Sequence, residues 1–292
     1  MTLIKERSGF ILAVALYGTI GLLLRYSALP SEATAFYRGA IGAAFIFLYR
    51  LARGERPDFG SMRKNAFWLI VSGVGLGLNW IFLFAAYMNT TVAVASLCNY
   101  MAPVFVLALT PLVLREKIDI RKIPCIIAAF FGIVMVSGVL SGGINGGAGI
   151  AFGLAAACCF TGIVFCNRKL KGISAFDRAL VQLAISSLTV LPYVIVKNGT
   201  LPLPDLRSGA IVLTLGIVHT GIAYCLYFNG MAALPVQSVA ILGYLEPVVS
   251  VICSAIFLHE TLGWTGWLGA VTVLAAAVIS ELIPEKEKAK TE

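Results

Sequence analysis

The segment Tyr100-Met-Ala-Pro-Val104 recurs 144 residues later as Tyr244-Leu-Glu-Pro-Val248, and both copies lie inside long apolar runs. At the same offset, Leu114-Arg-Glu116 corresponds to Leu258-His-Glu260. Proline and glutamate that coincide at one register indicate an internal repeat, although short apolar segments can also match by chance. The chain therefore reads as two related halves.

The composition around these segments is that of a membrane protein. Of 292 residues, 59% are hydrophobic and 12% are charged, and the mean hydropathy is +0.92. Soluble domains contain about 25% charged residues, so this chain lacks the charge that a water-facing surface needs. A bilayer-spanning helix takes about 20 apolar residues, which leaves almost no chain for an extramembrane domain. The composition excludes a soluble enzyme.

Apolar runs between charged and turn-forming residues predict ten transmembrane helices and an all-α fold. The basic residues before the first run resemble a signal peptide, but the run is long and lacks a clear cleavage site, so we expect a retained helix. The ten spans are expected near residues 8–25, 31–50, 66–87, 91–114, 121–139, 148–167, 175–196, 208–229, 236–258 and 263–282.

The distribution of basic residues predicts that both termini are cytoplasmic. With that orientation, 18 of the 22 Lys and Arg residues fall on inside segments and 3 on outside segments, and Arg38 alone lies within a span. Excess Lys and Arg gather on cytoplasmic loops. This rule accounts for the net charge of +8 without a nucleic-acid partner.

Five spans per half is an odd number, so the second half is expected to cross the membrane in the opposite direction. We expect residues 8–140 to form the first five-helix repeat, 147–282 the second, and 283–292 a charged cytoplasmic tail. In inverted repeats of this kind, a substrate site is expected near the midplane between the halves.

The paired Tyr-x-x-Pro-Val segments within ten spans resemble the drug/metabolite transporter superfamily, and most closely its EamA-type exporters. Gly77-Leu-Asn-Trp-Ile81 leading to Tyr100 looks like one EamA domain, and Gly221–Phe228 leading to Tyr244 looks like the second. The resemblance covers roughly residues 8–282. It implies a transporter, most often of amino acids and related metabolites, in a prokaryotic inner membrane. It also implies that the first, third, fourth, sixth, eighth and ninth helices line a cavity, with the fifth and tenth at the periphery.

Glu246 is the candidate that stands out inside the membrane, because a charged side chain at the bilayer centre is costly. It precedes Pro247, which clashes with the carbonyl four residues earlier and is expected to kink the ninth helix near Gly243. Pro103 occupies the equivalent helix-break position in the fourth span. A carboxylate at such a break could bind a substrate ammonium group, carry a coupling proton, or hold helices together.

Inside the predicted spans, Arg38 is the only cation that we expect, and we expect no aspartate. Its planar guanidinium suits a substrate carboxylate, but an ion pair, with Glu246 for example, or a clamp on backbone carbonyls that holds helices together is the favoured interpretation. His219 in the eighth span, near Gly216, Thr220 and Gly221, could relay protons or bind a carboxylate. An ordinary satisfied interior histidine is the alternative.

The densest polar and aromatic group combines Asn79 and Trp80 with Asn99 and Tyr100. Ligand pockets are mainly apolar and aromatic with a few placed polar groups, but interhelical hydrogen bonding explains such residues as well. Similar candidates lie in the first and ninth spans, at Tyr17 and Tyr244.

These patterns favour a secondary transporter of small polar metabolites that works by alternating access, most plainly an exporter of amino acids or similar compounds. The alternatives are a transporter of nucleotide sugars, sugar phosphates or drugs, or a passive channel. We expect no enzyme, catalytic residue, metal or cofactor. The expected partners are a small-molecule substrate and the bilayer, with the chain as a monomer or homodimer.

The seven cysteines lack CxxC spacing and read as buried hydrophobes rather than disulfides.

Overall fold

The computed structural model describes residues 2–90, 92–115, 118–136, 146–257 and 263–283, and every regular element there is a helix. Helices suit these apolar runs because they satisfy their own backbone groups where water is absent. The elements are α1 (Thr2–Gly18), α2 (Ile20–Leu24), α3 (Ser31–Ala52), α4 (Phe59–Lys64), α5 (Ala66–Asn89), α6 (Val92–Asn99), α7 (Ala102–Val113), η1 (Ile120–Lys122), α8 (Ile123–Val136), α10 (Gly147–Lys169), α11 (Ala175–Asn198), α12 (Leu206–Thr214), η2 (Leu215–Ile222), α13 (Ala223–Ala233), α14 (Val236–Gly243), α15 (Leu245–Phe257) and α16 (Trp264–Leu282).

The predicted spans coincide with these helices to within about four residues, except that α1 begins at Thr2 rather than at residue 8. Within the part of the chain that the structure describes, seven helices are long and apolar enough to cross a membrane, two shorter apolar helices cover Val236–Ser250 and Trp264–Ser280, and α8 ends at Val136. The protein is therefore an all-helical membrane protein. The count of ten spans stays a prediction, and the proposed tail beyond Ile283 and the repeated Glu116 and Glu260 lie outside the described residues.

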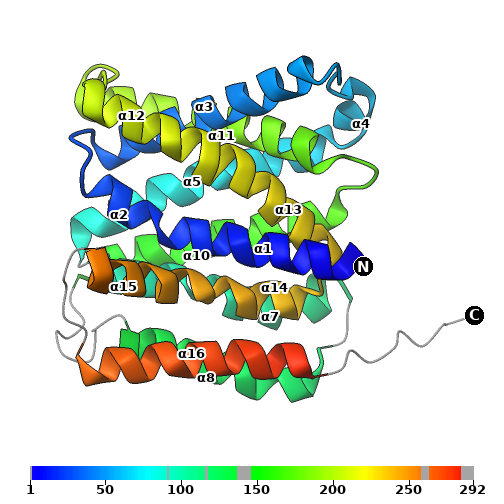
Figure 1. Cartoon of the computed structure of the whole chain (residues 1–292), viewed down its shortest axis with the longest axis vertical. Coiled ribbons are helices and arrows are strands. Elements are labelled where there is room, and N and C mark those ends of the chain that lie inside the picture. Colours follow the sequence, from blue (N-terminus) through cyan, green and yellow to red (C-terminus); the bar gives the residue numbers. More distant parts are fainter. Residues whose placement is uncertain (1, 91, 116–117, 137–145, 258–262, 284–292) are drawn as a thin grey trace, which may run out of the picture.

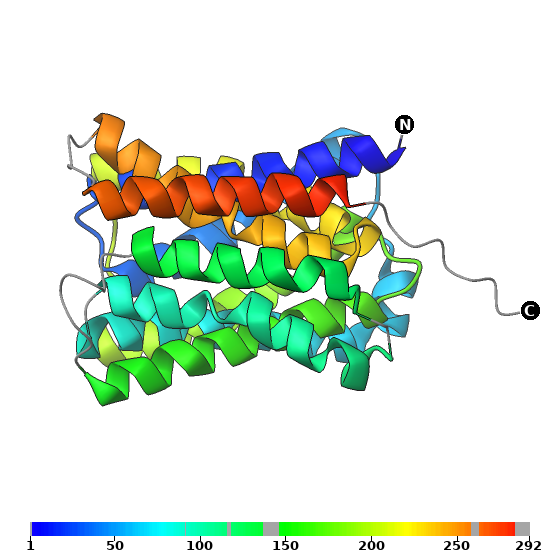
Figure 2. The ribbon, with the colours of Figure 1, turned by 90° about the horizontal axis from the view of Figure 1, so that it is seen from below.

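The helices lie side by side in an elongated bundle, with α8 and α16 paired at one edge (Figures 1 and 2). The contacts between elements come in matched pairs when the two predicted halves are exchanged. Thus α1 packs on α13 as α10 packs on α5, and α3 packs on η2 as α11 packs on α5. The start of α1 and the end of α16 lie at the same end of the bundle (Figure 1).

Large apolar side chains cover the outer faces of the bundle. Val196 is 85% exposed, Leu112 77% and Leu188 67%, which in water would form an aggregating surface. Trp264 and Trp267, at the start of α16, are also exposed. These faces are suited to lipid, because acyl chains solvate apolar side chains.

Among the described residues, three α-helices begin with a side-chain cap: α4, α11 and α12. The carboxylate of Asp205 accepts a hydrogen bond from the Ser208 backbone N–H at 3.0 Å, and Asp58 does the same with Ser61 at 3.0 Å. At α11, the Ser174 hydroxyl accepts from the Asp177 N–H. Each cap satisfies a backbone donor that the first helical turn leaves unpaired, so it fixes where the helix starts.

Two sequence expectations about charge are wrong. Asp177 and Arg178 lie in the first turn of α11, both buried, and Arg50 is buried near the end of α3. They are tolerated because each is paired: Arg50 forms an ion pair with Asp177, and Arg178 donates to the Phe228 carbonyl at 2.9 Å. Arg38 is therefore not the only cation inside the helices. All seven cysteines are free.

Candidate functional site

Two helices break four residues before the repeated prolines. The helix α6 ends at Asn99, four residues before Pro103, and α14 ends at Gly243, four residues before Pro247. A proline has no N–H and its ring clashes with the carbonyl four residues earlier, which favours a break there, although α7 and α11 continue through Pro111 and Pro192. The hydroxyl of Tyr244, at the second break, donates to the Tyr100 carbonyl at 3.1 Å. The two repeat-related breaks therefore meet, and Tyr244 is fully buried between them.

Two further interruptions occur without proline. The first span is divided at Thr19, between α1 and α2, and the eighth contains the π-helical η2. Short π-helical segments often mark functional sites. The Thr19 hydroxyl lies 2.8 Å from the Leu16 carbonyl and 2.9 Å from Nε2 of His219. The Thr19 hydroxyl and Nε2 of His219 share this hydrogen bond, and the tautomer of the imidazole decides which of the two donates.

Arg38 lies on the face of Trp80. The guanidinium carbon is 4.4 Å from the centre of the indole ring, a cation–π contact, and its Nε has no hydrogen-bond partner in the described part of the chain. Gly39 lets α3 approach closely here, since a Cβ on it would lie 2.4 Å from the Ser187 hydroxyl. Trp80 is buried while Arg38 is half-buried. The cation–π contact with Trp80 thus positions the guanidinium without using its N–H donors.

Glu246 shares this electrostatic environment. The Glu246 residue is half-buried, and its carboxyl group interacts electrostatically with Arg38, yet the two do not reach the 4.0 Å of a direct ion pair among the described residues. Five tyrosines also lie within range of its charge: Tyr17, Tyr87, Tyr100, Tyr224 and Tyr227. The anion and the cation thus face one group of aromatic side chains without a direct ion pair.

Three of these tyrosines form a packed group. The ring centre of Tyr17 is 5.5 Å from those of Tyr224 and Tyr227. The Tyr17 hydroxyl is buried without a partner in the described residues, whereas the Tyr87 hydroxyl is 3.3 Å from that of Ser96. An unpaired phenol beside a carboxylate is a group that a ligand can satisfy.

The predicted group around Asn79 divides in the structure. The Asn79 amide donates to the Ala156 carbonyl at 2.8 Å and to the Asn99 side chain at 3.2 Å, so it ties α5 to α10 and α6. Its neighbour Trp80 faces Arg38 instead. Adjacent helical residues point about 100° apart, which explains why the pair does not act together.

Sequence reasoning did not single out Tyr87, Tyr224, Tyr227 or Thr19. A signal was available for the tyrosines, because Tyr224 and Tyr227 are three residues apart, and Tyr87 lies seven residues after Trp80, so each pair shares a helix face. Thr19 carries no such signal, because its role depends on a histidine 200 residues away.

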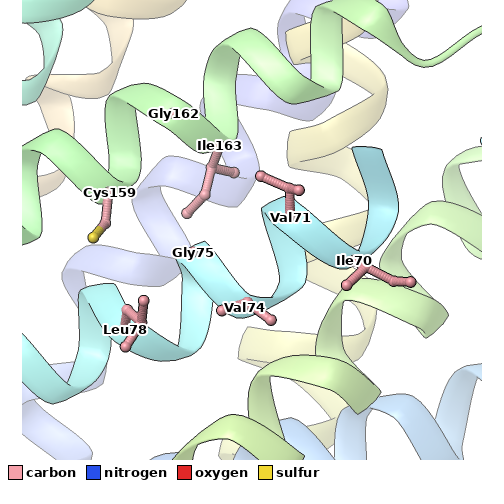
Figure 3. Close-up of a pocket in the computed structure, with 8 residues that line it drawn as sticks. All are labelled: Ile70, Val71, Val74, Gly75, Leu78, Cys159, Gly162 and Ile163. Carbon is pink, nitrogen blue, oxygen red and sulfur yellow. The ribbon is translucent and has the colours of Figure 1, made fainter. Parts of the chain in front are cut away.

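The apolar hollow in Figure 3 is a different place. It has a volume of about 400 Å³, lies between α5 and α10, and contains none of the residues named above. Among the described residues, no group of three His, Cys, Asp or Glu side chains could hold a metal ion.

Comparison with known proteins identifies the family. The sequence profile of the EamA-like transporter family matches residues 8–138 and 147–282. The chain belongs to this family. It therefore carries two EamA repeats, is a transporter rather than an enzyme, and is a multi-pass membrane protein whose partners include the bilayer and a small-molecule substrate.

Relatives and a solved structure agree with this assignment. The uncharacterized transporter YxxF of Bacillus subtilis is 26% identical over 87% of this chain and 84% of its own. The uncharacterized inner membrane transporter YicL of Salmonella typhimurium is 21% identical over 95% of each chain. One crystal structure, 20% identical, superposes with a TM-score of 0.82 over 95% of this chain and 97% of that one, so the fold is shared.

Proposed function

We propose that this EamA-family transporter exports amino acids or amino-acid-like compounds, with Glu246 and Arg38 binding the two charges of a zwitterion. The observation that carries the proposal is that the two side chains share one aromatic enclosure without pairing directly. A substrate ammonium group would lie between Glu246 and the tyrosines, where cation–π attraction adds to charge attraction. The free guanidinium donors of Arg38 would bind the carboxylate.

The site would lie between two five-helix halves, residues 8–140 and 147–282, that rock about it with both termini cytoplasmic. Support comes from the origin of the residues: Arg38 and Trp80 lie in α3 and α5 of the first half, and Tyr227 and Glu246 in α13 and α15 of the second. A site divided between the halves is exposed to one side at a time when they rock.

We further propose that Glu246 carries any coupled proton. His219 is the other candidate, but its Nε2 is committed to Thr19, so the imidazole instead holds the break in α1 against η2. The carboxyl group of Glu246 has no direct ion-pair partner among the described residues, so it is free to exchange its proton for a substrate ammonium group.

The test is efflux of labelled amino acids from proteoliposomes with and without a pH gradient. We expect saturable transport that a pH gradient accelerates, and we expect Glu246→Gln to remove the acceleration. Glu55→Gln, at an exposed carboxylate, is the matched control. Saturable transport of a nucleotide sugar, sugar phosphate or drug with no amino-acid transport would contradict the substrate assignment. Flux that does not saturate would indicate a channel.

A further inference from the structure

An open apolar hollow lies between the first turns of α5 and the last turns of α10. Ile70, Val71, Val74 and Leu78 line one side, and Cys159 and Ile163 the other (Figure 3). Ile70 is 51% exposed. A glycine from each helix also lines it, and a Cβ on Gly162 would meet nothing within 4 Å. The hollow is therefore a groove on the outer face with room for a slender apolar chain.

A second, polar hollow lies at the end of the same helix pair. It has a volume of about 360 Å³ and is lined by Asp58, Gly60, Ser61, Lys64, Lys171 and Gly172. Asn65 connects its two sides, because its amide donates to the Lys171 carbonyl at 2.9 Å and its oxygen accepts from the Lys171 N–H at 3.0 Å. The backbones that carry the two lysines are therefore fixed next to each other.

The groove and the polar hollow follow one another along the helix pair. Lys64 is the last residue of α4, one residue before the Asn65 break that precedes α5, and Lys171 lies two residues after the end of α10. The polar hollow therefore adjoins the ends of the two helices that line the groove. Phe67, exposed in the first turn of α5, lies seven residues before Val74 and shares its helix face.

The polar hollow attracts anions. Neither the Lys64 nor the Lys171 ammonium group forms an ion pair with any described residue, and both side chains are exposed. One carboxylate is present, Asp58, whose oxygen is already bound by the Ser61 N–H at 3.0 Å. That bond holds the pKa of the Asp58 carboxyl below its usual range. Two positive charges against one negative leave a net attraction for a phosphate group.

We propose that these two hollows form one binding site for an anionic phospholipid, with an acyl chain in the groove and the phosphate between Lys64 and Lys171. Basic pockets beside transmembrane helices on the cytoplasmic side are suited to anionic headgroups. A zwitterionic phospholipid fits less well, because its own cationic headgroup would face the lysines. The site is separate from the proposed transport site, and it shares with the proposed function only the orientation in which both termini are cytoplasmic.

The test is native mass spectrometry of the full chain in detergent, titrated with phosphatidylglycerol, phosphatidylcholine or inorganic phosphate. We expect phosphatidylglycerol to bind at least about tenfold more tightly than phosphatidylcholine. The double substitution Lys64→Gln with Lys171→Gln should weaken phosphatidylglycerol binding about thirtyfold, given the contribution of each lysine near an anionic lipid. Lys64→Arg with Lys171→Arg should retain it.

The groove is tested by Gly162→Phe, because a Cβ at Gly162 meets nothing within 4 Å and the side chain would occupy the groove. This variant should weaken binding of phosphatidylglycerol, whereas Val278→Phe on the outer face of α16 should not. The charge control is Lys5→Gln with Arg53→Gln, which removes two charges outside the hollow and should leave binding unchanged.

Several outcomes would overturn the proposal. The two phospholipids could bind with equal affinity, or phosphatidylglycerol could bind unchanged to the double Lys→Gln variant or to Gly162→Phe. Displacement of phosphatidylglycerol by an equal concentration of inorganic phosphate would also overturn it. Loss of a dimeric species in Gly162→Phe would also overturn it, because the groove would then be a subunit interface. The lipid comparison uses the unsubstituted chain, so it remains decisive if a variant fails to fold.

Discussion

The substitution Gly18→Ala tests the packing that holds α15 against α1 beside Glu246. Gly18 is the last residue of α1 and is buried. A Cβ at this position would lie 2.6 Å from the Glu246 carbonyl oxygen and 2.7 Å from the Val249 Cβ. Ordinary heavy-atom contacts are about 3.5–4.0 Å, so the two helices would have to separate by roughly 1 Å. One of the two close atoms belongs to backbone, which cannot rotate away.

The expected cost follows from two opposing effects. Overpacking a well-packed interior costs about 1–3 kcal/mol. Replacing glycine by alanine within a helix recovers up to about 1 kcal/mol, and less at Gly18 because α1 ends there. We therefore expect Gly18→Ala to lower the free energy of unfolding by about 1–2 kcal/mol.

Gly21→Ala is the matched control. It lies in the same span, and the nearest heavy atom to a Cβ there is the Ser250 Oγ at 3.9 Å, an ordinary contact. Equilibrium unfolding in mixed micelles measures both variants. We expect Gly21→Ala to be neutral or slightly stabilising. Equal unfolding free energies for the two variants would refute the close approach of α1 and α15.

Two other predictions concern charged groups near the ends of helices. Asp177→Asn should destabilise the protein by about 3 kcal/mol, because it removes the buried carboxylate of the pair with Arg50. Glu55→Gln removes the exposed carboxylate that lies 3.7 Å from the same guanidinium, and it should change the free energy of unfolding by less than about 0.5 kcal/mol; equal effects would contradict the burial argument. The hydrogen bonds from Ser208 hold the pKa of the Asp205 carboxyl below its usual range, so its ionised form stabilises the fold above about pH 4, and this contribution is lost as pH falls through the lowered pKa. Asp205→Asn should therefore be less stable than the unsubstituted protein at neutral pH and should show a shallower decline of stability below about pH 4; an identical acid profile would argue against the cap.

The spans and the proline breaks could be predicted from the sequence, because both follow from local rules. Apolar runs between charges set the helix ends, and the clash four residues before Pro103 and Pro247 favours the breaks at which α6 and α14 stop. Both effects act within a few residues. The local rule does not decide which prolines break a helix, because α7 and α11 continue through Pro111 and Pro192.

The partners of the site residues could not be predicted in this way. Arg38 was considered for a direct pair with Glu246, but it lies on Trp80, and only the packing of α3 on its neighbours decides this. Likewise, the break at Thr19 has no proline to announce it, and its partner His219 comes from the other half of the chain. The burial of charged residues at helix ends could not be predicted either, because the ion pair that stabilises Asp177 of α11 is formed with Arg50 of α3.

The most direct test of the account is a binding comparison on the amino acid that is transported best. Its affinity would be measured beside that of the amine lacking the carboxylate and the acid lacking the ammonium group. In the unsubstituted protein we expect both analogues to bind at least about tenfold more weakly, since each leaves one charged side chain unpaired. In Glu246→Gln, the acid should bind as tightly as the amino acid, while the amine should still bind more weakly. In Arg38→Gln, the amine should bind as tightly as the amino acid, while the acid should still bind more weakly. If both variants lose both discriminations equally, or neither loses any, Glu246 and Arg38 do not bind the two charges of one substrate.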